Sequence, residues 1–298
     1  MSALSGAPAL RGRMVDIGGR RLHIVCEGPG GAHPTVLFEA GAFGFSADWA
    51  AVQRRLTAEG VRSCAYDRAG LGFSDPGPGP RDGLKVAADL EALLKAADEP
   101  GPYILVAHSM AGLHAHLFAA RNPGVTAGLV LLDAATPEAS REGPMRAFVE
   151  QFGVLAQMAD WGASAGLFKP FAFMGDSIGL TGAPAAEKRW AFAHGRHNHW
   201  AADEVRQWMA TAGEAEQAGA LDRSLPVAVI TAGPGRGGWK QAQEAPAARA
   251  LHGWIDHVVD ASHATLLGEG FADRVVKGVD FVRAAAADHP APRAHGAS

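Results

Sequence analysis

The stretch from residue 103 to 112, YILVAHSMAG, constrains the fold of this chain more than any other. Residues 103–106 form a short apolar run of β-forming residues, which predicts a buried strand. Residues 113–120 are rich in alanine and leucine and predict a helix. The chain must therefore turn from strand to helix within a few residues, with Ser109 at the corner.

Small residues flank this serine at the two positions where a sharp turn leaves least room. Ala107 stands two residues before Ser109 and Ala111 two residues after it, where glycine is usual. Alanine is the next smallest residue, so the pattern indicates a nucleophile elbow, in which a strained serine is presented at the tip of the turn. An ordinary serine cap at the start of a helix is the alternative.

The rest of the chain alternates short apolar strands with helices. Strands are expected over 14–17, 21–26, 35–39, 63–66, 128–133, 226–231 and 254–259, and helices over 49–59, 84–97 and 272–285. Gly18-Gly19 predicts a hairpin between the first two strands, and Asp48 is available to cap the helix that begins at residue 49. This alternation predicts an α/β fold with a mostly parallel sheet covered on both faces.

Composition excludes some classes of partner. The formal net charge of −4 offers no electrostatic case for nucleic acid or an anionic membrane. No apolar run reaches the length of a membrane span, and residues 1–13 lack the apolar segment of a signal peptide, so a cytoplasmic protein is expected. Cys26 and Cys64 both fall in strand-like runs and are expected as buried free thiols, with a disulfide as the less favoured alternative.

The order of these motifs resembles the α/β-hydrolase superfamily, and serine esterases and lipases in particular. The hairpin, the Glu-Ala-Gly turn after residue 38, the loop Asp67-Arg68-Ala69-Gly70-Leu71-Gly72-Phe73-Ser74, the elbow and a late Ser-His pair follow one another over roughly residues 12–285. The resemblance implies a hydrolase core over 12–133 and 218–285, a helical lid over 134–217 and a flexible tail over 286–298. It does not identify a substrate.

A serine hydroxyl needs a base, which the resemblance places at His263, just past the last strand. His108, next to Ser109, is expected to pack or to form hydrogen bonds near the site. The imidazole needs an acid. The commonest family pattern has an aspartate after strand 226–231, but residues 232–239 contain no carboxylate.

Some members of the superfamily take the acid from the end of the preceding strand, where this chain has Asp133. A carboxylate at the end of a buried strand is expected to have a partner. The alternative is a structural aspartate that binds backbone amides. Glu244, expected in the loop after strand 226–231, is the reserve, with Asp260 behind it.

Two backbone N–H groups are expected to bind the oxyanion, those of Met110 and Ala42, or that of Phe43 if the turn is shifted by one residue. The Asp67–Arg68 pair and Ser74 are interpreted as a buried brace outside the site. His194, His197 and His199 resemble a metal cluster, but they lack a matching carboxylate or cysteine pattern and are interpreted as a histidine-rich helix end. No metal and no cofactor are expected.

The predicted lid is dense in large apolar residues and also contains glycines that would let its segments move. The apolar residues are Phe148, Phe152, Leu155, Met158, Trp161, Leu167, Phe168, Phe171, Phe173, Met174, Trp190, Phe192, Trp200, Trp208 and Met209, and the glycines are Gly162, Gly166, Gly175, Gly179 and Gly182. Aromatic residues and methionines beyond what a small cap can bury favour an apolar pocket mouth.

These observations predict a serine hydrolase that cleaves carboxylic esters with an apolar acyl or aromatic group through an acyl-enzyme. A serine nucleophile argues against dehalogenase and epoxide hydrolase chemistry, which in this superfamily use an aspartate. Amidase, aminopeptidase, carbon–carbon bond hydrolase and acyltransferase activity remain open with the same three residues. A non-catalytic ligand-binding protein of the same fold is the further alternative, because no aspartate follows Thr231.

Overall fold

A computed structural model describes residues 6–31, 34–164, 176–235 and 237–288 of the chain. Eight strands form a single sheet with the order β1-β2-β4-β3-β5-β6-β7-β8. β2 pairs antiparallel with β1 on one side and with β4 on the other, and all neighbours from β4 to β8 are parallel. The strands are β1 Arg13–Asp16, β2 Arg21–Glu27, β3 Thr35–Glu39, β4 Ser63–Tyr66, β5 Tyr103–His108, β6 Thr126–Leu132, β7 Val227–Ala232 and β8 Gly253–Val258. The predicted α/β fold with a mostly parallel sheet is confirmed.

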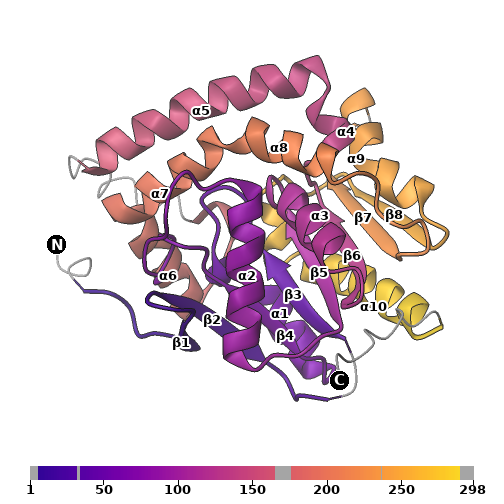
Figure 1. The fold of residues 1–298 in the computed structure, drawn as a ribbon, viewed down its shortest axis with the longest axis horizontal. Coiled ribbons are helices and arrows are strands. Elements are labelled where there is room, and N and C mark those ends of the chain that lie inside the picture. The colour runs from indigo at the N-terminus through magenta and orange to yellow at the C-terminus, as the bar shows by residue number, and fades with distance from the viewer. Residues whose placement is uncertain (1–5, 32–33, 165–175, 236, 289–298) are drawn as a thin grey trace.

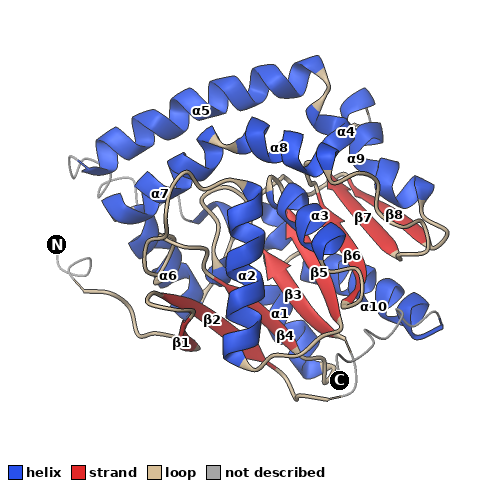
Figure 2. Cartoon of the chain, viewed as in Figure 1, coloured by secondary structure: helices blue, strands red, loops and turns tan. Residues whose placement is uncertain are grey.

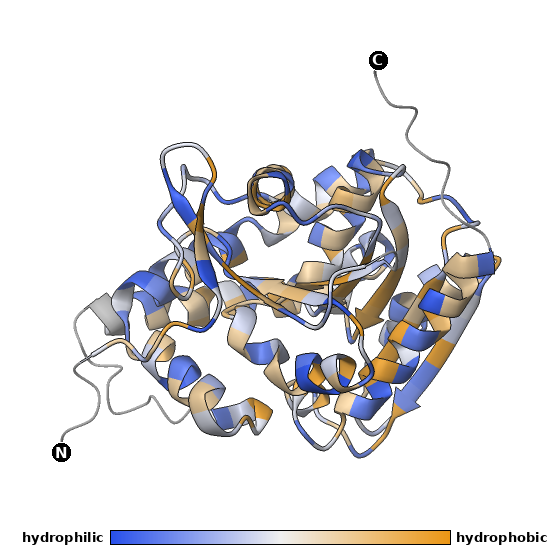
Figure 3. Ribbon diagram, turned by 90° about the horizontal axis from the view of Figure 1, so that it is seen from below, coloured by the Kyte–Doolittle hydropathy of each residue, from blue (hydrophilic) through white to orange (hydrophobic). Residues whose placement is uncertain are grey.

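Helices cover both faces of this sheet (Figure 2). α1 Ala50–Ala58 and α10 Ala272–Asp288 pack on one face, and α2 Gly83–Ala97, α3 Ala111–Arg121 and α9 Gly238–Arg249 pack on the other. Because successive side chains of a strand point to opposite faces, Val36 and Phe38 of β3 join the core under α1 and α10, whereas Leu37 joins the core under α2 and α3. In Figure 3 the apolar colours run through the strands at the centre of the molecule.

The segment between β6 and β7 forms a helical layer across the carboxyl edge of the sheet (Figure 1). It contains α4 Pro137–Ser140, α5 Gly143–Ser164, α6 Gly182–Phe192, α7 Gly195–Arg206 and α8 Trp208–Gln217. Trp208 packs with Leu113 and Leu117 of α3 in one buried cluster, so α8 packs directly on the helices that cover the sheet. That residues 134–217 act as a lid stays a prediction. Residues 165–175 lie outside the described part, and with them the predicted Gly166, Leu167, Phe168, Phe171, Phe173, Met174 and Gly175.

Three details of the predicted elements are wrong. The helix expected from residue 49 begins at Ala50, after a 3₁₀ turn over Ser46–Trp49, and Asp48 does not cap it. The buried Asp48 carboxylate instead pairs with Lys188 of α6, 2.7 Å away. A buried charge without a counter-charge costs more free energy than a missing helix cap. Glu244 lies inside α9 rather than in a loop, and α10 extends to Asp288, three residues past its predicted end.

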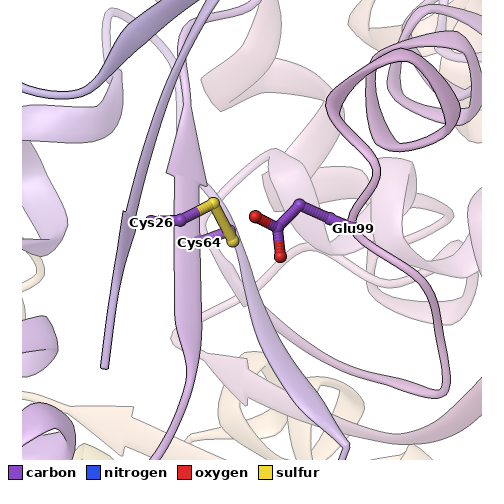
Figure 4. Close-up of side chains that lie close together, drawn as sticks. All are labelled: Cys26, Cys64 and Glu99. Atoms are coloured by element: carbon purple, nitrogen blue, oxygen red, sulfur yellow. A yellow bond between two sulfur atoms is a disulfide. The ribbon is translucent and has the colours of Figure 1, made fainter. Parts of the chain in front are cut away.

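The expectation of free thiols at Cys26 and Cys64 is also wrong. The two residues lie directly opposite each other on the antiparallel neighbours β2 and β4, with their Cα atoms 4.0 Å apart, and their sulfur atoms are bonded (Figure 4). The chain alone could not show this, because 38 residues separate the cysteines and only the strand order makes them partners. Glu99 lies beside the bridge, but sulfur atoms joined to each other are not thiolate ligands for a metal.

No helix in the described ranges has both the length and the apolar character that crossing a membrane requires.

Candidate active site

Ser109 stands at the corner between β5 and α3 with a left-handed backbone, φ +58°. Its N–H donates to the carbonyl of Leu132, 3.1 Å away, and its carbonyl accepts from the N–H of Ala135 at 2.8 Å. These bonds tie the corner to the end of β6, which holds a conformation that a residue with a Cβ adopts only at a cost. The serine is half-buried, so its hydroxyl remains accessible.

The elbow needs small neighbours, as its sequence indicated. Ala107 and Ala111 are fully buried. A Cβ on Gly112 would lie 2.3 Å from the carbonyl oxygen of Ala135, so this position accepts glycine only. The glycine that the tight packing demands is therefore Gly112, three residues after the serine, while alanine suffices at the two flanks.

The loop after β3 approaches the serine closely. A Cβ on Gly41 would lie 2.9 Å from the Cβ of Ser109, and the N–H of Gly44 donates to the carbonyl of Gly41 across a turn in which Phe43 has φ +57°. Within the described residues, the N–H groups of Ala42 and Met110 donate to no other protein group. The structure thus brings both predicted oxyanion donors next to the same serine.

His263 and Asp133 meet across a sequence distance of 130 residues. His263 follows β8 on a loop, and its Nδ1 donates to Asp133 Oδ2 at 2.7 Å. Asp133 directly follows β6, with φ +45°, and its side chain is 8% exposed, whereas that of His263 is half-exposed. The carboxylate therefore holds the ring through Nδ1, and Nε2 takes no part in this contact.

The second oxygen of Asp133 has a charged partner that sequence reasoning missed. Lys240, in the first turn of α9, contacts Asp133 Oδ1 through its ammonium group, and the N–H of Ala232 donates to the same oxygen at 3.4 Å. Burial alone would raise the pKa of the Asp133 carboxyl, but the hydrogen bonds from His263 and Lys240 outweigh it and hold the pKa below its ordinary value. This carboxyl is ionised at any pH at which an imidazole can act as a base.

The reserve carboxylates lie elsewhere. Glu244 accepts from the hydroxyl of Thr231, which also contacts Nδ1 of His257 at 2.7 Å. Asp260 is exposed to solvent. Of the three carboxylates considered from the sequence, Asp133 is the one that contacts the ring of His263.

His108 holds the loop that carries His263. Its Nε2 donates to the backbone carbonyl of His263 at 2.9 Å, and the two rings lie 4.4 Å apart. Burial, and then the positive charge that His263 can carry, lower the pKa of His108 to about 3, so it is neutral near pH 7. It therefore holds the loop that carries His263 as a neutral hydrogen-bond donor.

Arg68 braces the loop after β3, which places it closer to Ser109 than its sequence suggested. Its guanidinium is 2% exposed and donates to the carbonyls of Ala40 and Gly41. It does not pair with Asp67, which instead accepts from His23 Nδ1 at 2.9 Å.

Two buried carboxylates balance the charge of this guanidinium. Glu204 of α7 lies 2.8 Å from it and Glu39 at the end of β3 lies 3.5 Å from it. The loop is buried as predicted, but the predicted Asp67–Arg68 pair is wrong, because Arg68 is held by Glu204, 136 residues away, which no local pattern could indicate.

Lys188 of α6 fixes the same loop from the other side. Its buried ammonium donates to the carbonyl of Phe43 at 3.0 Å and to Asp48. Two buried ion pairs thus connect the inserted helices to the segment that carries Ala42, one through Lys188 and one through Glu204. These ion pairs anchor α6 and α7 to the core of the protein.

A cavity of about 440 Å³ opens at these residues. Ser109, His263 and Asp133 line it together with apolar side chains from the inserted helices and from α9, which are Ala135, Met145, Phe148, Trp208 and Trp239. Of the predicted apolar lid residues, Phe148 and Trp208 reach this cavity, whereas Leu155, Met158 and Trp161 are exposed on α5. The wall opposite the serine is therefore apolar.

The three histidines near residue 197 have separate partners. His194 Nδ1 donates to the carbonyl of Trp190 at 2.6 Å, His197 Nδ1 accepts from the N–H of Gly72 at 3.0 Å, and His199 contacts Asp160 at 3.1 Å. Each ring is oriented by its own contact, as expected of a histidine-rich helix end.

Comparison with known proteins identifies the family of the chain. Residues 34–207, more than half of the chain, match the model of a family described as the alpha/beta hydrolase fold. The chain belongs to the alpha/beta hydrolase fold family. Among solved structures, an enol-lactonase from Burkholderia xenovorans is 17% identical with a TM-score of 0.66, covering 91% of this chain and 99% of its own. An esterase from Thermogutta terrifontis is 20% identical with a TM-score of 0.64, covering 89% and 94%. At such identities the likeness concerns the fold alone.

Sequence relatives of this alpha/beta hydrolase match it over a limited stretch. A probable transporter, efuK, from Hormonema carpetanum is 40% identical over 104 residues, which are 34% of this chain and 15% of that protein. The chain spans less than half the length of each of the first three curated relatives that it matches.

Proposed function

We propose that this alpha/beta hydrolase is a serine hydrolase that cleaves carboxylic esters with an apolar acyl or aromatic group. The observation that carries the proposal is the common cavity: a left-handed serine, a histidine hydrogen-bonded to a buried aspartate, and an apolar wall all face it. A hydrolysed ester needs a nucleophile, a base of fixed orientation and donors for the oxyanion, and one residue or backbone group is available for each role.

The reaction would proceed in two halves. Ser109 Oγ attacks the ester carbonyl while His263 Nε2 takes its proton, and the N–H groups of Met110 and Ala42 bind the oxygen that becomes negative. His263 returns the proton to the departing alcohol, which leaves an acyl group on Ser109. Water, deprotonated by the same ring, then attacks the acyl carbonyl and releases the acid. Asp133 keeps the ring in the tautomer that can accept a proton.

Labelling with a fluorophosphonate tests the proposal, because the reagent reacts with an activated serine whatever the natural substrate. We expect modification of the native protein at Ser109, located by peptide mass, and none of Ser109→Ala. Absence of label on folded native protein would contradict the proposal and favour the ligand-binding alternative. If the reagent labels Ser109, turnover by unlabelled protein of amides, of carbon–carbon substrates or of an ester with an acceptor alcohol would reassign the reaction to one of the other uses of the same three residues.

A further inference from the structure

We infer that Lys240 is a positioning residue that extends the working range of His263 toward lower pH by sharing the carboxylate of Asp133. The inference rests on the proposed function and concerns a residue that contacts Asp133 but takes no part in the bond-making steps. The contact that carries it is the ammonium group of Lys240 on Oδ1 of Asp133, with His263 on Oδ2 of the same carboxylate.

The geometry places this cation behind the Asp133 carboxylate. The Lys240 side chain is 14% exposed and that of Asp133 is 8% exposed, so solvent screens the pair poorly. Lys240 sits in the first turn of α9, next to Trp239, which lines the cavity. In an ordinary triad the aspartate faces the imidazolium as a full negative charge. Here a second positive charge lies on the other oxygen of the same carboxylate.

The consequence follows from charge balance. When His263 takes the proton of Ser109, the group of three carries two positive charges and one negative charge, instead of one of each. The imidazolium is therefore less favoured than it would be without Lys240, and the ring stays neutral, and able to act as a base, to a lower pH. Lys240 and the imidazolium lie on the two oxygens of one carboxylate, so they are a few ångströms apart. At the dielectric of a half-exposed site, the repulsion between them should displace the protonation midpoint of the ring by about one pH unit.

Other groups of the described residues near the ring differ from Lys240 in charge or in partner. From β5, His108 faces the loop that carries His263 but is neutral. From β7 and β8, Thr231 and His257 contact each other, and Thr231 also donates to Glu244 of α9. From α6, Lys188 is neutralised by Asp48. The inserted helices present Met145, Phe148 and Trp208 to the cavity, none of which is charged.

Lys240→Met tests the inference, since it removes the charge and keeps much of the chain length. We expect the acid limb of the kcat/KM–pH profile for a p-nitrophenyl ester to move up by about one pH unit, while the rate on the alkaline plateau stays within a few-fold of native. Lys240→Arg restores the charge and should leave the limb in its native position. Lys277→Met, an exposed lysine on α10, is the control for loss of one positive charge anywhere on the protein.

A purely structural role for Lys240 would lower the rate equally at every pH and leave the limb in place, which would overturn the inference. An NMR titration of the His263 ring protons in native protein and in Lys240→Met measures the same displacement without any substrate. An unchanged midpoint would overturn the inference even if no ester is turned over. A displaced midpoint in a protein that fluorophosphonate does not label would uphold it and reject the proposed function.

Discussion

Replacing Asp133 by asparagine separates catalysis from folding at this site. The carboxylate accepts from His263 Nδ1 at 2.7 Å and from Lys240, so it has no donor of its own to offer the ring. A carboxamide has one, and when its NH₂ group faces Nδ1 the ring proton is held on Nε2. A ring in that tautomer cannot take the proton of Ser109.

The expected loss of turnover is about 10⁴-fold, or about 5.4 kcal/mol in transition-state stabilisation. The fold should survive, because the amide oxygen can still accept from Ala232 or Lys240. Stability should nevertheless fall by about 1–3 kcal/mol, since Lys240 at 14% exposure loses its counter-charge. The double variant with Lys240→Met removes that uncompensated charge and should recover most of this loss in stability without recovering turnover.

The assays are kcat for a p-nitrophenyl ester at a pH on the plateau, and the free energy of unfolding from urea titration. Native-like kcat in Asp133→Asn would refute the assignment of the acid and transfer the role to Glu244. A 10⁴-fold loss accompanied by a collapse of the urea midpoint would instead show that Asp133 acts through the fold, because the reasoning requires the two effects to differ in size.

Three further predictions concern the surroundings of the site. Lys188→Met removes the charged partner of the buried Asp48 and should lower the free energy of unfolding by about 3–5 kcal/mol, as measured by urea titration. The variant should also have a lower kcat, because Lys188 no longer holds the turn at Phe43. A stable variant with native kcat would contradict this. Burial raises the pKa of Glu39 from 4.5 to about 7, so the folded state binds an extra proton between these values and stability should fall, by at most about 3 kcal/mol, as pH rises from 4.5 to 7. Urea titrations at pH 5 and 7.5 should show this decline relative to Glu39→Gln, and parallel curves would rule it out. Because the cavity wall is apolar, KM for p-nitrophenyl esters should fall from acetate to octanoate, and a constant KM would reject an apolar acyl site.

Short stretches of the sequence determine many features of this protein. The alternation of apolar strands and helices, the Gly18-Gly19 hairpin and the strand–Ser109–helix corner depend on neighbours only a few residues apart, so local propensity and side-chain size determine them. For the same reason the sequence predicted a serine at the carboxyl end of a central strand. The order of motifs predicted His263 as the base for that serine.

Other features depend on which strands and helices become neighbours, and only the tertiary structure decided them. Cys26 meets Cys64 because β2 lies beside β4, and Asp133 meets His263 because β6 lies two strands from the loop after β8. Lys240 and Glu204 are ordinary charged residues on amphipathic helices until packing places each against a buried partner. A charge that packing buries is stabilised by a counter-charge that is close in space but far away in the sequence, so no local sequence pattern identifies that counter-charge.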